Sequence, residues 1–184
     1  MLLQTKFFAP AINPKAIERP RLLSQVARSS GRKLTMVIAA AGYGKTTLLS
    51  QWRHESESPF TWLALDESDN EPRRFWLYVI GAFQKIDSAL GAEASKLLNQ
   101  AEFEHFEAAI TSLVNDLSQY QVDKPPIVFV MDDFHHISDF DIMRHFVYLV
   151  DYLPPNVHIA LTSRTEPVLP LSRWRVKNFI TEIY

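Results

Sequence analysis

The strongest constraint on the fold is the segment at residues 39–47, which reads AAAGYGKTT. Its first eight residues fit the P-loop pattern, with alanine at the first position where glycine is more usual. Gly42 and Gly44 allow successive backbone N–H groups to converge on phosphate oxygens. An apolar run over residues 34–40 precedes the segment, and helical spacing resumes at Lys45. The sequence therefore predicts a strand, a phosphate-binding loop and a helix, in that order.

Both backbone and side chains would take part in this phosphate site. Lys45 would place a positive charge at the β- and γ-phosphates, and Thr46 would offer its hydroxyl to Mg²⁺. The positive end of the following helix would face the same anion. A plain turn between a strand and a helix is the alternative, and the predicted flanking elements argue against it. We expect the nucleotide to contact Ala40, Ala41, Gly42, Tyr43, Gly44, Lys45, Thr46 and Thr47.

A second motif, IVFVMDD, ends in two adjacent acids. The apolar residues 127–131 predict a buried strand, and Asp132 and Asp133 stand at its carboxyl end, where α/β sheets bind ligands. Such a strand end is by itself more often a turn, but downstream of a phosphate loop it is a candidate Walker B motif. Asp132 would then hold the magnesium shell, while Asp133 would orient or deprotonate the attacking water.

Basic residues near the end of the chain have a functional and a structural interpretation. Arg164 follows a strand predicted over residues 158–162, so its guanidinium is a candidate sensor of the γ-phosphate; a solvated arginine is the alternative. Arg173, Arg175 and Lys177 form a small cluster. A solvated loop is favoured there over a contact with phosphate or a partner.

Acidic residues after the second predicted strand are assigned a structural role. Asp66, Glu67 and Asp69 miss the calcium-loop pattern, because Glu71 stands where that pattern needs glycine. Capping of the helix that begins near Pro72 is favoured instead.

Metal binding is not expected at the adjacent residues His135 and His136. Neighbouring side chains on an extended segment diverge, and no third ligand is suitably spaced. Trp52, Trp62 and Trp76 fall on apolar faces and are assigned to the core.

Strands alternate with helices along the chain, which predicts an α/β fold with a parallel five-stranded sheet between helix layers. Residues 1–16 are expected to form an extended arm, and residues 17–184 a P-loop nucleotide-binding domain. Because the last predicted strand reaches Tyr184 without a cap, we expect the natural polypeptide to continue. The predicted strands cover residues 34–40, 60–65, 127–131, 158–162 and 179–183, and the predicted helices cover residues 19–28, 45–54, 73–86, 93–100, 103–120 and 140–152.

Composition narrows the class of protein. The 184 residues are 47% hydrophobic and 22% charged, as expected for one folded domain. A net charge of −2 does not favour nucleic acid as the partner. Cysteine is absent, and no stretch approaches the roughly 18 apolar residues that span a bilayer. A cytoplasmic location is expected.

The chain resembles the maltose-regulator type of signal-transduction ATPase, the large LuxR-like ATP-binding transcriptional regulators of bacteria. Five blocks, in order, carry this resemblance over nearly the whole chain: TKFFAPAINPKAIERPRLL, AAAGYGKTTLLSQW, WLALDESDNEPRRFWLYVIGAFQ, VFVMDDFHHI and LTSRTEPVLPLSRWRV. Together they are far more specific than the P-loop alone.

The resemblance implies an ATP/ADP switch with Mg²⁺, in which the ADP form rests and inducer plus ATP drives self-association. It also implies that Ile17 and Arg19 lie near the adenine or ribose. In the family this domain precedes a winged-helix region, a repeat-built sensor and a C-terminal helix-turn-helix, none of which fits within 184 residues. The chain would thus be the nucleotide-binding part, without direct contacts to DNA. The family usually has one histidine after the acidic pair, where this chain has His135 and His136.

Two other functions remain open from the sequence. A free-standing P-loop ATPase or kinase would use the same motifs, although no arginine-rich insertion suggests the lid that a kinase needs. A nucleotide-binding interaction module without turnover is the other alternative. For the switch, hydrolysis is expected to be slow, with Lys45, Asp133 and Arg164 as the catalytic set.

Overall fold

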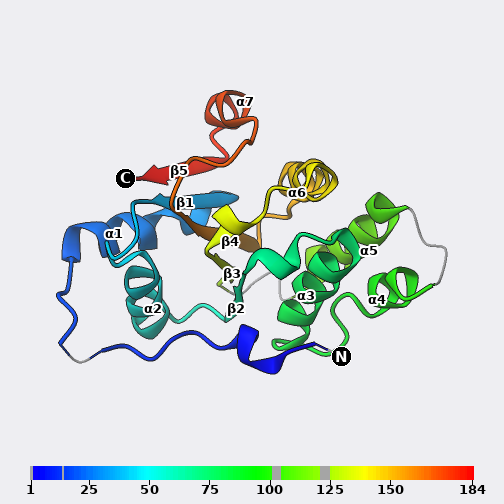
Figure 1. The fold of residues 1–184 in the computed structure, drawn as a ribbon, viewed down its shortest axis with the longest axis horizontal. Helices are drawn as coiled ribbons and strands as arrows, with labels where there is room; N and C mark the ends of the chain where they lie inside the picture. The colour runs from blue at the N-terminus through cyan, green and yellow to red at the C-terminus, as the bar shows by residue number, and fades with distance from the viewer. Residues whose placement is uncertain (1, 14, 101–104, 121–124) are drawn as a thin grey trace.

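The computed structural model describes residues 2–13, 15–100, 105–120 and 125–184. Its centre is a five-stranded sheet with strand order β2-β3-β4-β1-β5 (Figure 1). Every neighbouring pair in this sheet is parallel. The strands are β1 (Leu34–Ile38), β2 (Phe60–Ala64), β3 (Ile127–Asp132), β4 (Val157–Ser163) and β5 (Ile180–Ile183).

Helices connect the strands and lie on both faces of the sheet (Figure 1). The α-helices are α1 (Pro20–Arg28), α2 (Lys45–Glu55), α3 (Pro72–Gln84), α4 (Ala92–Leu98), α5 (Phe106–Gln119), α6 (Phe140–Tyr152) and α7 (Leu171–Val176). Short 3₁₀ helices are η1 (Gln4–Phe7), η2 (Ser29–Gly31), η3 (Glu67–Asp69) and η4 (Phe134–His136). No helix in the described part of the chain has the length and apolar character needed to cross a bilayer.

Side chains alternate between the two faces of each strand, and each face has its own core. On one face, Val37 and Val128 pack with Trp52 and other apolar residues of α1 and α2. On the other face, Met36 and Phe129 pack with residues from α3 to α7. The strands are apolar on both faces because both faces are covered, as is typical of parallel sheets.

The strand order brings three distant segments to one edge of the sheet. The register pairs Ile38 with Ser163, at the carboxyl ends of β1 and β4. Asp132 ends β3, which lies on the other side of β4. The crevice at this edge is the usual ligand site of an open α/β sheet. The P-loop, the acidic pair and Arg164 therefore leave the sheet on the same side.

The predicted fold class is confirmed, and so are the five strands to within a few residues. The three tryptophans assigned to the core, Trp52, Trp62 and Trp76, are all buried. Pro14 and the first residues of the helix predicted over 103–120 lie outside the described residues.

The basic cluster predicted as a loop is instead largely helical. Arg173 and Arg175 lie on α7, which packs Leu171 and Trp174 into the core. Arg173 pairs with Asp151 at 2.7 Å, and Arg175 forms an ion pair with Glu182 at 2.6 Å. The loop prediction was wrong because α7 is too short to show a clear helical period, and its two buried residues decide the structure.

The expected N-terminal arm also contains structure that the sequence did not reveal. η1 turns at Gln4–Phe7, and the Phe7 side chain is buried against α3. In Figure 1 this segment, in dark blue, runs beside β2 and the end of α3 before the chain crosses to α1.

Candidate nucleotide-binding site

The loop between β1 and α2 has the backbone conformation that a phosphate cradle needs. Gly42 and Gly44 have φ angles of 81° and 77°, in the left-handed region that residues with a Cβ rarely adopt. Gly44 is also the N-cap of α2, and its carbonyl accepts from the Leu48 N–H at 2.9 Å. The first N–H groups of a helix have no intrahelical acceptor, so those of Lys45 and Thr46 are available to an anion.

Lys45 is held against the loop that precedes it. Its ammonium donates to the carbonyls of Ala39 at 2.7 Å and Ala40 at 3.0 Å, and only 8% of the residue is exposed. The loop residues Ala40 to Tyr43 are exposed, in contrast. A phosphate in this loop would thus meet backbone N–H groups from the loop and one positive charge from its inner side.

Asp132 connects the P-loop helix to two strands. Its Oδ1 accepts from the Thr46 hydroxyl at 2.9 Å and from the Thr162 hydroxyl at 2.6 Å. Burial raises the pKa of Asp132 and the nearby Asp133 charge raises it further, while the two hydroxyl donors oppose the shift. A carboxylate deprived of water in this way is stabilised by a nearby cation.

The donor set fits magnesium bound together with a nucleotide. Mg²⁺ prefers oxygen ligands, keeps several waters and commonly binds through one or two carboxylates plus substrate phosphates. The Thr46 hydroxyl and the Asp132 carboxylate supply such oxygens. Over the described ranges, no group of three or more His, Cys, Asp or Glu residues is arranged for a metal ion. The phosphates would therefore have to complete the coordination.

Asp133 follows Asp132 in an unusual backbone conformation. Its φ of 59° is left-handed, and its N–H donates to Thr162 Oγ1 at 2.8 Å. In this turn 41% of the Asp133 side chain is exposed. Thr162, which lies outside both the P-loop and the IVFVMDD motif, therefore fixes both acids through one hydroxyl. Only the pairing of β4 beside β3 would have identified it.

His135 lies beside this acid on η4. Its Nδ1 is 3.7 Å from Asp133 Oδ1, and its ring stacks at 4.3 Å on that of His136. Neither buried ring nitrogen has a hydrogen-bond partner among the described residues. Burial lowers the pKa of His135; the His136, Arg164 and Lys45 charges lower it too, and Asp133 opposes them. Burial and these charges therefore disfavour the protonated imidazole, although Asp133 lies within 3.7 Å.

The structure brings some of the remaining predicted residues to the site. Arg164 is exposed just after β4, and its charge acts on His135. Arg19 donates to the Tyr43 carbonyl at 2.9 Å and lines a pocket of about 70 Å³ beside the loop. Ile17 is 82% exposed and does not line this pocket.

The acids after β2 are caps and ion-pair partners. The side chain of Asp66 caps η3 by accepting from the Ser68 N–H. Asp69 is buried and pairs with Lys6 and Arg74. The helix α3 is capped by Glu71, which accepts from the N–H groups of Arg73 and Arg74. Capping was the predicted role, but Glu71 rather than the three acids before it caps α3.

Comparisons with known proteins agree with this geometry. A family model described as "AAA domain" matches residues 27–164. The chain is 33% identical over 183 residues to the "HTH-type transcriptional regulator MalT" of Serratia proteamaculans, and 30% identical to that of Yersinia enterocolitica. Each match covers 100% of this chain and 20% of the relative, so the chain spans about a fifth of these proteins.

Solved structures support the fold alone, because their sequence identities are low. Cdc6p from Pyrobaculum aerophilum superposes with a TM-score of 0.57 at 15% identity, over 96% of this chain and 47% of that one. A signal-transduction ATPase with numerous domains from Pyrococcus horikoshii, with a tetratricopeptide repeat sensor, gives 0.56 at 14% identity, over 95% and 24%.

Proposed function

Because the chain belongs to the AAA domain family, we propose that it is the ATP/ADP-binding switch domain of a MalT-like transcriptional activator. Membership in a P-loop family implies nucleotide binding, typically with Mg²⁺. The similarity of the whole chain to about a fifth of the MalT regulators supports a regulatory role for that binding. In the intact regulator, ATP promotes self-association and slow hydrolysis ends it. We place this activity in the cytoplasm, as expected for a transcriptional regulator.

One observation carries the proposal: the P-loop threonine and the β3 acid share a hydrogen bond at the carboxyl edge of the sheet. Thr46 and Asp132 are 86 positions apart in sequence, yet their side chains meet at 2.9 Å. The Thr46 hydroxyl, which we assign to magnesium, thus lies beside a carboxylate from the strand, and the Lys45 ammonium bonds the carbonyls of Ala39 and Ala40 on the inner side of the loop. A structural turn would not need that combination.

Each residue then has a defined task. The loop from Ala40 to Thr47 cradles the phosphates, with Lys45 supplying charge and Thr46 a magnesium ligand. Asp132 would hold the magnesium shell, and Asp133 would orient or deprotonate the attacking water. Ile17 and Arg19 border the adenine or ribose. The hydrogen bond from Arg19 to the Tyr43 carbonyl supports this assignment for Arg19.

The alternative functions are not favoured. A free-standing ATPase or kinase shares the phosphate site, but the MalT relatives match the whole chain and not the motifs alone. A binding module without turnover would not need Asp133, whose backbone is held in a left-handed conformation directly after Asp132. Titration calorimetry of the nucleotide-stripped chain with Mg–ATP and Mg–ADP tests the proposal; the absence of binding would contradict it.

Arg164→Ala is expected to weaken ATP binding by about 10- to 100-fold and to leave ADP affinity nearly unchanged. A ligand that binds two conformations of a protein with equal affinity does not shift the equilibrium between them. A switch that responds to ATP and not to ADP therefore needs a group that contacts the γ-phosphate alone. A charge-assisted hydrogen bond of this kind contributes about 1.5 to 3 kcal/mol. The same titrations, on wild type and variant, measure the difference.

Arg173→Ala is the control for Arg164→Ala. It removes an arginine that is also partly exposed, but one that pairs with Asp151 on α6. Its ATP and ADP affinities should both match wild type. If Arg164→Ala lowers the two affinities together, or changes neither, Arg164 is a solvated residue and not the sensor.

A further inference from the structure

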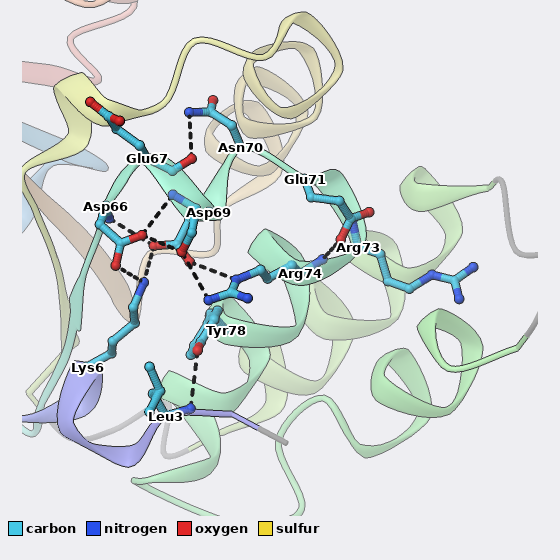
Figure 2. Close-up of polar contacts among 11 residues, drawn as sticks. Leu3, Lys6, Asp66, Glu67, Asp69, Asn70, Glu71, Arg73, Arg74 and Tyr78 are labelled. Carbon is cyan, nitrogen blue, oxygen red and sulfur yellow. Dashed lines mark hydrogen bonds and ion pairs between the residues drawn. The ribbon is translucent and has the colours of Figure 1, made fainter.

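A buried ion cluster fixes the segment that follows β2. Asp69 is fully buried, and its carboxylate pairs with Lys6 of η1 and with Arg74 of α3, as Figure 2 shows. Lys6 is itself almost buried and reaches Asp66 at 2.7 Å. A buried carboxylate is tolerated only when it is paired. Two cations from separate elements therefore hold η3 at one position relative to the sheet.

The ring of Tyr78 on α3 supports the same cluster. The Lys6 ammonium lies 4.9 Å from its centre and the Arg74 guanidinium 5.4 Å. The Tyr78 hydroxyl accepts from the Leu3 N–H at 3.2 Å (Figure 2). The N-terminal segment is thereby fastened to α3 and η3 by its backbone as well as by Lys6.

Asn70 follows this cluster and reaches the loop beyond the acidic pair. Its side-chain oxygen accepts from the N–H groups of Ser138 at 2.8 Å and Asp139 at 3.0 Å. Its side-chain nitrogen donates to the carbonyls of His136 and Glu67. A carboxamide has two donors and two acceptor sites, and here all four are used.

The loop that Asn70 holds carries Asp133, to which the attacking water is assigned, and its neighbour His135. It begins at Asp133, whose N–H is bound by Thr162, and ends at Asp139, which caps α6 by accepting from the Ile142 N–H. The Asn70 amide forms hydrogen bonds with the backbone of this loop at three residues, His136, Ser138 and Asp139. Asp133 and His135 lie within three residues of those bonds.

We propose that Asn70 is a positioning residue for ATP hydrolysis: it fixes the loop that carries Asp133 and His135, and the Lys6–Asp69–Arg74 cluster fixes Asn70. The inference depends on the proposed hydrolysis. It adds that the N-terminal segment belongs to the catalytic machinery, because η1 supplies Lys6. Asn70 contacts no phosphate in this scheme, so it controls the rate and not nucleotide affinity.

Asn70→Ala is expected to lower ATP turnover by about 10- to 100-fold, since a displacement of about 1 Å in a catalytic group costs that much. The ATP and ADP dissociation constants should change by less than about threefold. Asn99→Ala is the matched control: its side chain also donates to a backbone carbonyl, of Ser95, but on the exposed end of α4. It should turn over at the wild-type rate.

Lys6→Met tests the second part of the inference. Methionine keeps most of the length of the buried stem but removes one of the two cations that pair with Asp69 and leaves Arg74. Turnover should therefore fall, as in Asn70→Ala, but by a smaller factor. Lys85→Met is its control, because Lys85 holds the same segment through Gln4 and the Phe7 ring without contacting η3. Equal turnover in the two lysine variants would mean that the ion cluster does not fix the position of Asn70.

Amide hydrogen exchange separates this inference from the proposed function. Without nucleotide, Asn70→Ala should accelerate exchange at Ser138 and Asp139 and over residues 133–137, while β4 keeps its protection. Unchanged exchange in the loop overturns the positioning role whatever the turnover. A parallel loss of turnover and nucleotide affinity also overturns it, because that result indicates general damage to the fold. If wild type neither binds nor hydrolyses ATP, the proposed function fails, and the exchange result still decides the role of Asn70 in the loop.

Discussion

Asp133→Asn is expected to reduce ATP turnover by about 10²- to 10⁴-fold while ATP still binds with near wild-type affinity. A positioned general base commonly contributes a factor of this size. The Asp133 side chain is 41% exposed, whereas Asp132 is buried and bonded to Thr46 and Thr162. Water can therefore reach Asp133, and the division of tasks between the two acids follows from their different surroundings.

Asparagine is the informative replacement because of the backbone at this position. With φ at 59°, Asp133 is in the left-handed region, where asparagine and aspartate are the side chains best tolerated after glycine. The N–H bond to Thr162 is made by the backbone and survives the change. Alanine would strain the left-handed backbone, so a lower rate could come from the lost carboxylate or from a distorted loop.

Single-turnover hydrolysis, with nucleotide affinity measured in parallel, checks this prediction. Asp141→Asn, on the exposed first turn of α6, is the control and should hydrolyse ATP at the wild-type rate. The wild-type rate is itself expected to be low, because a cationic finger from a second subunit is commonly worth about 10³ to 10⁵. Turnover that survives in Asp133→Asn, or that falls together with affinity, would contradict the assignment.

Features of the site that depend on neighbouring residues in the chain could be predicted from the sequence. Gly42 and Gly44 are needed because their backbone is left-handed, and Lys45 and Thr46 begin the helix that the loop feeds. Likewise, the apolar run that ends at Asp132 is a fully buried strand. In each case a local pattern carries the information, since a buried parallel strand needs apolar residues on both faces.

Features that depend on contacts between distant segments could not be predicted. Thr162 is one threonine among several until β4 pairs beside β3 and places its hydroxyl between the two acids. Asn70 bonds residues 66 to 69 positions further along the chain. Lys6 is a buried charge in a segment with no periodicity, and only the position of Asp69 explains it. Contacts of this kind form only in the tertiary structure, and the spacing of residues along the sequence does not indicate them.

Lys45→Ala is expected to abolish most of the stabilisation that nucleotide confers. At a ligand concentration of one hundred times the dissociation constant, linkage contributes about 2.7 kcal/mol. For a domain of this size that corresponds to a rise in melting temperature of about 5 to 10 °C. The variant's own melting temperature without nucleotide is the baseline, because the carbonyls of both Ala39 and Ala40 lose their bonds to the Lys45 ammonium.

Lys33→Ala controls for the loss of a partly buried lysine. Its ammonium also donates to a backbone carbonyl, of Asp151 at 2.6 Å, but Lys33 stands just before β1, at the opposite end of that strand from the P-loop. Whatever its melting temperature without nucleotide, this variant should show the full nucleotide-dependent rise, because linkage depends on affinity and not on the starting stability. A full rise in Lys45→Ala as well would mean that the phosphates bind elsewhere, and the assignment of the loop from Ala40 to Thr47 would fall with it.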